Sequence, residues 1–492
     1  MQDRLSIGNR LDFLGLREWR SREAARRLAR RAALTAQRWL LSDILSIFLA
    51  TRLIFLLITY FGRALMHDPA LVGSGNVGLG TGYLLDSWFY RDSQWYLTIV
   101  QDGYHYFGAG HRSAVAFFPV YPMIVKALNS LLGIDSGICA MLVSNLSFLG
   151  AMVFLYKLCL REYGEGTARR AVFYMAIFPT AFFTFAPYSE PLFLLCSVAS
   201  LYYMRGQRWW LAGIFGGLAA ATRVPGVLLA LAFAWEYLRT HRLPLPRIRL
   251  RILRRARSAR VGQSAHRVRH GWSRHAASAT AVAPVRAHPG GIRYPLAGVQ
   301  SQVPDDNHSY LQHDPSASAR SIGRDVLAGA LIPGGLGAYM VYLYGLAGDP
   351  LAFIKSAAGW GRAASWPWQV LATSLADVPR SAQSGQYLQA HALIENGLVI
   401  ACLLLLLIGI RRIPFSFVIY GLACLAVLLS APVATSDIPV TSMSRYLLVI
   451  APVYIVLAQL GRFAIFDRLY TLLSVGGLAI FTTLFLNHMW GA

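Results

Sequence analysis

Long apolar runs recur along most of this chain of 492 residues. A membrane-spanning helix needs ~20 mainly apolar residues, whereas a soluble chain of this length would divide into domains with polar surfaces. Hydrophobic residues make up 55% of the sequence and charged residues only 14%, against roughly 25% charged in soluble domains. The sequence therefore predicts an all-α polytopic membrane protein.

The apolar runs predict about eleven transmembrane helices. The first is Trp39–Phe61, and a long mixed segment separates it from the second. The other ten are Ile138–Leu160, Ala171–Pro187, Pro191–Met204, Leu211–Thr222, Gly226–Leu238, Val326–Leu346, Ala392–Ile410, Ile413–Pro432, Arg445–Leu460 and Tyr470–His488. Prolines interrupt several of these runs, and broken helices are tolerated at membrane depth only where protein or water satisfies the freed backbone groups.

The net charge of +23 is unevenly distributed. The tail 1–38 carries ten Arg against four acidic residues, and the segment 239–324 carries sixteen Arg against three Asp. Arg-rich segments stay cytoplasmic, and anionic lipid headgroups attract them. Because no aromatic or motif context accompanies these runs, we expect membrane lipids as partners and no nucleic acid. The same bias predicts a multi-pass protein of the plasma (inner) membrane with a cytoplasmic N-terminus.

The composition divides the chain into four parts. Residues 1–38 form a basic cytoplasmic tail, and residues 39–238 form an N-terminal transmembrane module with an external loop at 62–137. Residues 239–323 lack a hydrophobic period and are expected to be a disordered basic cytoplasmic loop. Residues 324–492 form a C-terminal transmembrane module with an external loop at 347–391. A GxGxxG pattern at 73–78 has no preceding strand, so it does not predict a dinucleotide site.

The first external loop combines carboxylates with aromatic rings. Asp86, Asp92 and Asp102 are interleaved with Trp and Tyr residues such as Trp95 and Tyr96. Trp and Tyr favour a membrane interface in any case, but that preference does not explain the three aspartates. Rings stack on sugar faces and carboxylates bind or deprotonate hydroxyls, so the pattern favours a carbohydrate site. Nucleotide sugars are absent outside the membrane, so an external site needs a lipid-carried donor.

The loop resembles the PIG-V family of GPI mannosyltransferases and its bacterial relatives, within the GT-C superfamily of membrane glycosyltransferases. The matching run in the loop is Arg91-Asp92-Ser93-Gln94-Trp95-Tyr96, then Gly103-Tyr104 and Phe117-Phe118-Pro119. Further matches are Phe178-Pro179-Thr180, Tyr188-Ser189-Glu190, Thr222-Arg223, Gly348-Asp349-Pro350 with Trp360 beyond, and Ser444-Arg445-Tyr446. The resemblance covers most of the chain except the N-terminal tail and the basic loop.

The resemblance implies a GT-C-type bundle and an inverting mannosyl or other hexosyl transfer from a polyprenyl-phosphate sugar. The acceptor would be a glycan, a lipid or a protein at the outer face. Asp92 matches the family's catalytic acidic residue, and a general base contributes ~10²–10⁴-fold. The residues expected to contact substrate are Asp86, Arg91, Trp95, Tyr96, Tyr104, Glu190, Arg223 and Arg445.

Arg223 and Arg445 are the candidates for the cation that the leaving phosphate needs. Asp86 is either a second acid or a metal ligand, although its neighbours offer no ligand spacing. No cofactor or metal is predicted, and a divalent-metal requirement stays open. The alternative function is a transporter or lipid flippase, which broken helices also suit. That alternative predicts charged residues clustered in mid-span and repeated halves, and the sequence shows neither.

Overall fold

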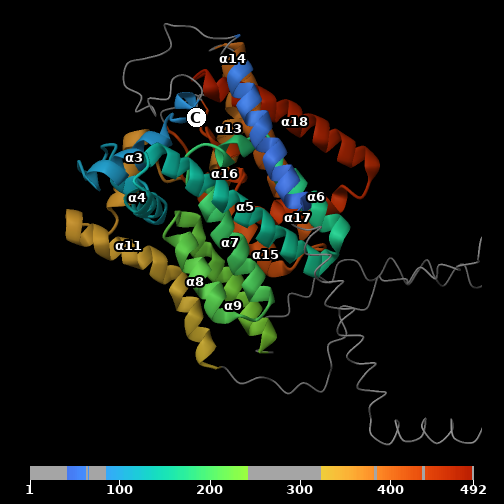
Figure 1. Ribbon diagram of the computed structural model, residues 1–492, viewed down its shortest axis with the longest axis horizontal. Coiled ribbons are helices and arrows are strands. Elements are labelled where there is room, and N and C mark those ends of the chain that lie inside the picture. Colours follow the sequence, from blue (N-terminus) through green and yellow to red (C-terminus); the bar gives the residue numbers. More distant parts are fainter. Residues whose placement is uncertain are drawn as a thin grey trace, which may run out of the picture. The chain divides into compact units, whose positions relative to one another are not determined.

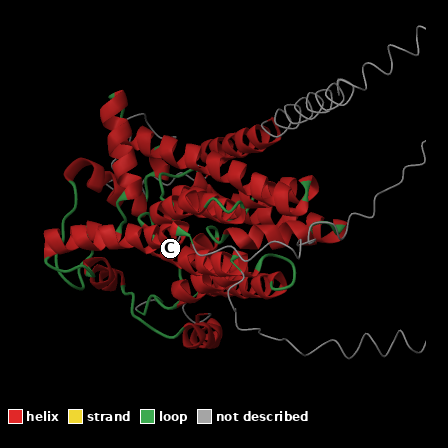
Figure 2. Cartoon of the chain, turned by 90° about the horizontal axis from the view of Figure 1, so that it is seen from below, coloured by secondary structure: helices red, strands yellow, loops and turns green. Residues whose placement is uncertain are grey.

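The computed structural model describes residues 42–62, 65, 85–241, 323–381, 385–434 and 438–489. Within these ranges the chain is helical, and the β-type pairing consists of one isolated bridge between Arg362 and Val433. Figure 2 shows only helices and loops in this part of the chain. The predicted all-α fold is confirmed.

The helices have the following bounds. After Ser42–Gly62, the first half contains η2 (Asp86–Trp88), α3 (Asp92–Asp102), η3 (Ala114–Ala116), α4 (Val120–Leu132), α5 (Ser136–Tyr163), α6 (Glu165–Ala176), η4 (Ala181–Thr184), α7 (Glu190–Arg205), α8 (Trp209–Ala220), η5 (Val224–Leu228) and α9 (Leu229–Thr240). The second half contains η7 (Arg324–Ala330), α11 (Leu331–Ala347), α12 (Ala352–Ala357), η8 (Ala358–Trp360), α13 (Pro367–Ser381), α14 (Gln386–Gly409), α15 (Phe415–Leu429), α16 (Met443–Leu447), α17 (Ala451–Leu460) and α18 (Ala464–Leu486).

Five of the described helices are long and apolar enough to cross a membrane: Ser42–Gly62, α5, η7 with α11, α14 and α18. Four shorter helices, α4, α8, α15 and α17, are also apolar. Each of the five long helices lies on an expected span, but the count of eleven is not confirmed. The expected span 171–187 differs most, because α6 ends at Ala176, three residues before Pro179. Proline cannot continue a helix, and it disfavours helical backbone in the residue before it.

The centre of the bundle is built on α7, which packs against α5 and α8. Figure 1 shows these three helices side by side. Buried residues follow one another along most of α7, from Glu190 to Ser200 with one interruption, so this helix has no exposed face over that length. A helix that is apolar all round is typical of a protein core or a membrane interior.

The seam between α8 and the continuous segment of η7 and α11 depends on glycine. A Cβ added to Gly213 would lie 2.1 Å from the carbonyl oxygen of Ala328, and one on Gly335 would lie 2.0 Å from the carbonyl oxygen of Gly217. The backbones therefore touch directly, as small residues allow at helix interfaces in membranes. The close seam connects the helices before and after the basic segment.

An ion-pair network fixes the end of α7 that carries Arg205. The Arg205 guanidinium pairs with Glu162 of α5 at 2.7 Å and with Glu236 of α9 at 3.1 Å. The Ser416 hydroxyl of α15 donates to Glu236 at 2.6 Å, and Arg239 pairs with the same carboxylate at 3.0 Å. These bonds tie four helices together, roughly 22 Å along α7 from Glu190 at 1.5 Å per residue.

The described residues other than Thr240 and His241 belong to one compact unit. The basic tail, the pattern at 73–78 and nearly all of the basic loop lie outside the described residues. The expected external loops at 62–137 and 347–391 contain helices: α3 and α4 in the first, α12 and α13 in the second.

Candidate functional site

Four charged side chains from distant parts of the sequence form one network. Arg445 of α16 pairs with Asp92 of α3 at 2.6 Å, and its Nε donates to Glu190 of α7. Arg223, in the turn between α8 and η5, pairs with the same Glu190 oxygen at 2.7 Å. Two carboxylates and two guanidinium groups thus alternate, and the formal charges of these four side chains sum to zero.

Each member of the network is placed by a helix end or a turn. Asp92 begins α3 and Glu190 begins α7, where the partial positive charge of a helix N-terminus favours a carboxylate. Arg223 has extended backbone, which separates α8 from η5. Arg445 lies on the five-residue α16, which follows Ser442 in the left-handed region at φ 70°. Helix interruptions therefore bring the four side chains together.

Burial separates the roles of the two carboxylates. The Glu190 side chain is 1% exposed, and its Oε2 atom has no hydrogen-bond partner among the described residues. The Asp92 side chain is 27% exposed. Among the arginines, Arg223 is 17% exposed and Arg445 is 6% exposed. Asp92 is thus the carboxylate that a molecule arriving from outside the protein can reach, while Glu190 holds the two arginines.

Ser189 connects the network to Tyr96. Its hydroxyl oxygen accepts hydrogen bonds from the Tyr96 hydroxyl at 2.7 Å and from Arg223 at 3.1 Å. Burial raises the pKa of the Tyr96 phenol well above its ordinary value, so this hydroxyl keeps its proton at neutral pH and remains a donor. Tyr96 thus lies beside the network and is linked to Arg223 through Ser189.

Aromatic rings lie beside the arginines of the network. The Arg445 guanidinium lies 4.6 Å from the Tyr188 ring and 5.5 Å from the Tyr446 ring. Arg223 is 5.5 Å from the Tyr446 ring and Arg362 is 5.4 Å from it. Three guanidinium groups therefore surround one tyrosine, within the range over which cations are attracted to ring faces.

A second aromatic group extends from α3. Trp95 stacks on Phe117 with centroids 5.7 Å apart and meets Trp360 edge-on at 5.6 Å. The Tyr104 hydroxyl donates to the Phe117 carbonyl at 2.8 Å. Trp95 and Tyr104 therefore support one aromatic group beside α3, and Tyr104 does so through the backbone of Phe117.

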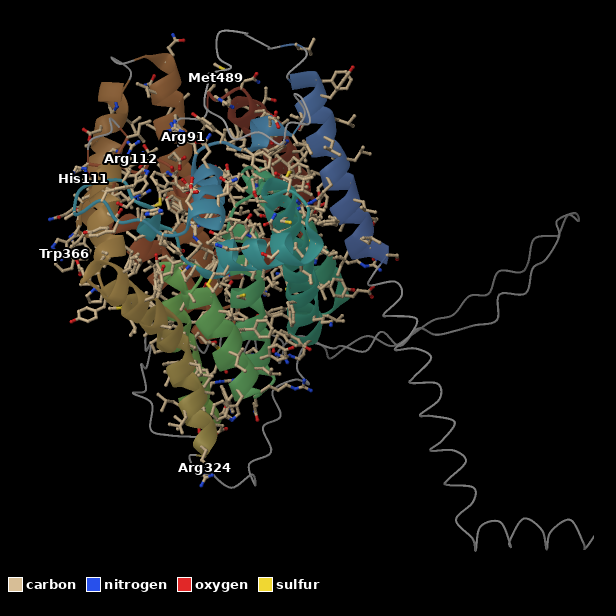
Figure 3. All side chains as sticks on the ribbon, turned by 60° about the vertical axis from the view of Figure 1, so that its left-hand side comes forward. Arg91, His111, Arg112, Arg324, Trp366 and Met489 are labelled. Atoms are coloured by element: carbon tan, nitrogen blue, oxygen red, sulfur yellow. The ribbon has the colours of Figure 1, made fainter. Side chains whose placement is uncertain are left out.

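Asp86 and Arg91 have other surroundings. Arg91 is exposed, lies 5.0 Å from the Tyr90 ring and forms no ion pair within the described residues. Figure 3 shows it toward the same end of the bundle as Met489. Asp86 begins η2, which the hydrogen bond from Trp88 to Thr59 anchors at 3.1 Å, and the four-residue ion-pair network does not include it.

Sequence reasoning did not single out Arg362 and Glu395. Arg362 donates to the Tyr446 hydroxyl at 2.9 Å and to the Ala431 carbonyl at 2.7 Å. Glu395 is fully buried in α14 and accepts two hydrogen bonds from Ser444. A glutamate inside an apolar run is itself a signal, because ionisable residues in spans mark functional sites. No such signal accompanies Arg362, which lies in a loop.

The described residues contain no group of three or more His, Cys, Asp or Glu side chains that could hold a metal ion. Asp92 and Glu190 each contact Arg445. The carboxylates of the network therefore have cationic partners of their own within the protein.

Residues 36–243 match the family model described as mannosyltransferase (PIG-V). The resemblance to PIG-V mannosyltransferases is confirmed over this segment. The matched part contains Asp92, Glu190 and Arg223, and Arg445 lies beyond it. This match supports a membrane glycosyltransferase, and the apolar helices agree with the membrane assignment.

Among solved structures, the Archaeoglobus fulgidus oligosaccharyltransferase in complex with Zn and sulfate is similar over 90% of this chain, with 14% identity and a TM-score of 0.36. The chain spans about half the length of that structure, 52%. No curated protein matches the sequence.

Proposed function

We propose that the protein transfers a hexose, mannose in the first instance, from a polyprenyl phosphate to an acceptor hydroxyl at the outer membrane face. The observation that carries this proposal is Asp92, a partly exposed carboxylate held by Arg445 at 2.6 Å, within the segment that matches mannosyltransferases. A general base needs a carboxylate within hydrogen-bonding reach of the acceptor hydroxyl. The ion pair with Arg445 orients that carboxylate.

In the proposed reaction the acceptor oxygen attacks C1 of the sugar, and its proton passes to Asp92. The bond between C1 and the phosphate oxygen breaks, and polyprenyl phosphate leaves with the electron pair. Attack opposite the leaving group inverts the anomeric centre. When Asp92 takes up the proton, Arg445 still has its ion pair with Glu190.

The leaving phosphate needs positive charge. Arg223 and Arg445 already share two carboxylates, whereas Arg362 forms no ion pair within the described residues. Around Tyr446 three arginines thus face two carboxylates, which leaves one positive charge. This excess supports phosphate binding beside Tyr446, with Arg223 and Arg362 as the phosphate contacts, since hydrogen bonds to charged groups contribute roughly 1.5–3 kcal/mol.

The test is to supply purified protein in lipid vesicles with radiolabelled polyprenyl-phosphate mannose, polyprenyl-phosphate glucose or the corresponding nucleotide sugars, together with a crude membrane-lipid acceptor fraction. We expect release of polyprenyl phosphate from a lipid-linked donor and none from nucleotide sugars. Transfer from a nucleotide sugar would contradict the proposal. Movement of intact donor between leaflets without cleavage would favour the flippase alternative.

A further inference from the structure

A buried carboxylate on α14 contacts the residue next to Arg445. The Glu395 side chain is 0% exposed, and it lies within the candidate span Leu388–Gly409. Its Oε2 accepts the Ser444 backbone N–H at 2.6 Å, and its Oε1 accepts the Ser444 hydroxyl at 2.7 Å. Nε2 of His391, one turn earlier on α14, lies 3.3 Å from the same Oε1.

Burying the Glu395 carboxylate costs free energy. A buried carboxylate loses its hydration, and the loss is large unless other groups compensate it. Within the described residues Glu395 has no Lys or Arg partner, and His391 is its neighbour of basic type. Two of its hydrogen bonds are directed at one residue, Ser444, and they join α14 to α16.

Ser444 is held at every polar group. Besides its two bonds to Glu395, its carbonyl accepts the Thr180 hydroxyl at 2.9 Å. Its side chain is fully buried. These hydrogen bonds fix the position of Ser444. Arg445 follows it directly in a helix of only five residues. So short a helix has little stability of its own, and Glu395 caps its first turn from another helix.

We infer that Glu395 is a positioning residue, which fixes the Arg445 guanidinium between Asp92 and Glu190 by holding Ser444. The inference rests on the proposed function for its effect on rate, and on the geometry alone for its effect on α16. Shifting Arg445 would misdirect Asp92, and a small misplacement of a catalytic group costs ~10–100-fold in rate.

The test compares Glu395→Gln with Glu236→Gln. Glu236 is a matched control because it is 2% exposed and also accepts a serine hydroxyl, but it lies at the other end of α7 from the site. We expect both variants to lower thermal stability. Only Glu395→Gln should lower kcat per folded molecule, by roughly 10-fold or more. Ser444→Ala, which removes one hydrogen bond and keeps the carboxylate, should lower kcat in the same direction by less.

A coupling measurement separates positioning from a general structural role. If Glu395 acts through Arg445, Glu395→Gln should change kcat by less than about twofold in an Arg445→Lys background, because residues acting as one unit are non-additive. Equal losses of kcat in both backgrounds, or an unchanged kcat in Glu395→Gln, would overturn the inference.

Hydrogen exchange gives a readout that needs no activity. In Glu395→Gln the amide of Ser444 should exchange faster, together with the rest of Met443–Leu447, while Glu236→Gln leaves that segment unchanged. Unchanged protection in Glu395→Gln would overturn the positioning role even if kcat falls. If the wild-type protein transfers no sugar but Glu395→Gln still speeds exchange at Met443–Leu447, the proposed function is rejected and the positioning role of Glu395 stands.

Discussion

Asp92 and Glu190 share the guanidinium of Arg445 but have different surroundings. Glu190 is buried, and one of its oxygens has no hydrogen-bond partner in the part of the chain that the structure describes, whereas Asp92 is partly exposed. Removing either charge would leave Arg445 with one carboxylate, so a loss of activity alone does not identify the base. Substitutions that keep the side-chain shape separate a chemical role from a structural one.

Asp92→Asn should cut transfer by at least ~10²-fold while leaving folding and donor binding nearly intact, because an amide cannot accept the proton. The measurement is rate and thermal stability on the same purified variant. Asp86→Asn and Asp102→Asn are controls with the same local change in charge. Near-normal transfer by Asp92→Asn would contradict its assignment as base, and a large defect in Asp86→Asn would move the base to that position.

Ala at Arg223 or Arg362 should raise the KM for the lipid-linked donor by ~10–100-fold, and Lys should restore part of it, because charge returns without the planar fork. Arg112→Ala is the control, since Arg112 also donates to a backbone carbonyl, that of Gly359 at 3.0 Å. Arg445→Ala is less informative because it unpairs two carboxylates at once. Normal donor kinetics in both the Arg223 and Arg362 variants would remove the phosphate assignment.

The motif residues could be found from sequence because each stands at a break in an apolar run. Glu190 precedes Pro191, and Arg223 precedes Val224-Pro225. Their partners could not be found, because the pairing depends on how distant helix ends meet. Arg362 carries no local signal in its loop, and the importance of Glu395 lies in its contact with Ser444, 49 residues away. The end of α6 was misplaced for a local reason instead, because the helix ends at Ala176, three residues before Pro179.

At the scale of the elements, close helix contacts hold the parts that carry the site. The turn that follows α8 carries Arg223, and α8 in turn meets α11 along a seam of glycines. A side chain added in that seam would force the two backbones apart and would displace the turn. The seam can be tested because α11 contains two adjacent glycines in different surroundings.

Gly335→Ala should destabilise the protein by roughly 1–3 kcal/mol, the usual cost of overpacking, because its Cβ would lie 2.0 Å from the Gly217 carbonyl oxygen. Gly334→Ala makes the same chemical change one residue earlier, where nothing lies within 4 Å. That control should be neutral or slightly stabilising, since Ala favours a helix. Thermal unfolding in detergent compares the two, and equal stability would show that the seam can relax.

At the scale of the whole molecule, the two ends of the described bundle carry different charged networks. Figure 3 shows Arg324 at the end opposite Arg91 and Met489. The Arg205 network and the Asp92 network likewise occupy opposite ends of α7. If Arg-rich segments stay in the cytoplasm, the end with Arg91 and Asp92 faces outside.

Reporter fusions after Arg38, within 115–120, near Gln300 and after Ala492 should therefore read inside, outside, inside and outside. The readout is the activity of a reporter that folds on one side of the membrane only. The fusion near Gln300 lies in the basic segment and serves as the reference for a cytoplasmic signal. An inside signal from the 115–120 fusion would place the Asp92 network on the cytoplasmic face and remove the argument for a lipid-linked donor.

The pairing of Arg445 with Glu190 spans 255 residues of sequence, and this has a consequence for synthesis. At ~5–20 residues per second, a ribosome needs roughly 15–50 s to travel between the two. During that interval Glu190 can pair with Arg223, 33 residues downstream, while Asp92 lacks its arginine. The nascent N-terminal half therefore carries an acidic group whose counter-charge has not been made. The chemistry of the site becomes complete only after Arg445 has left the ribosome.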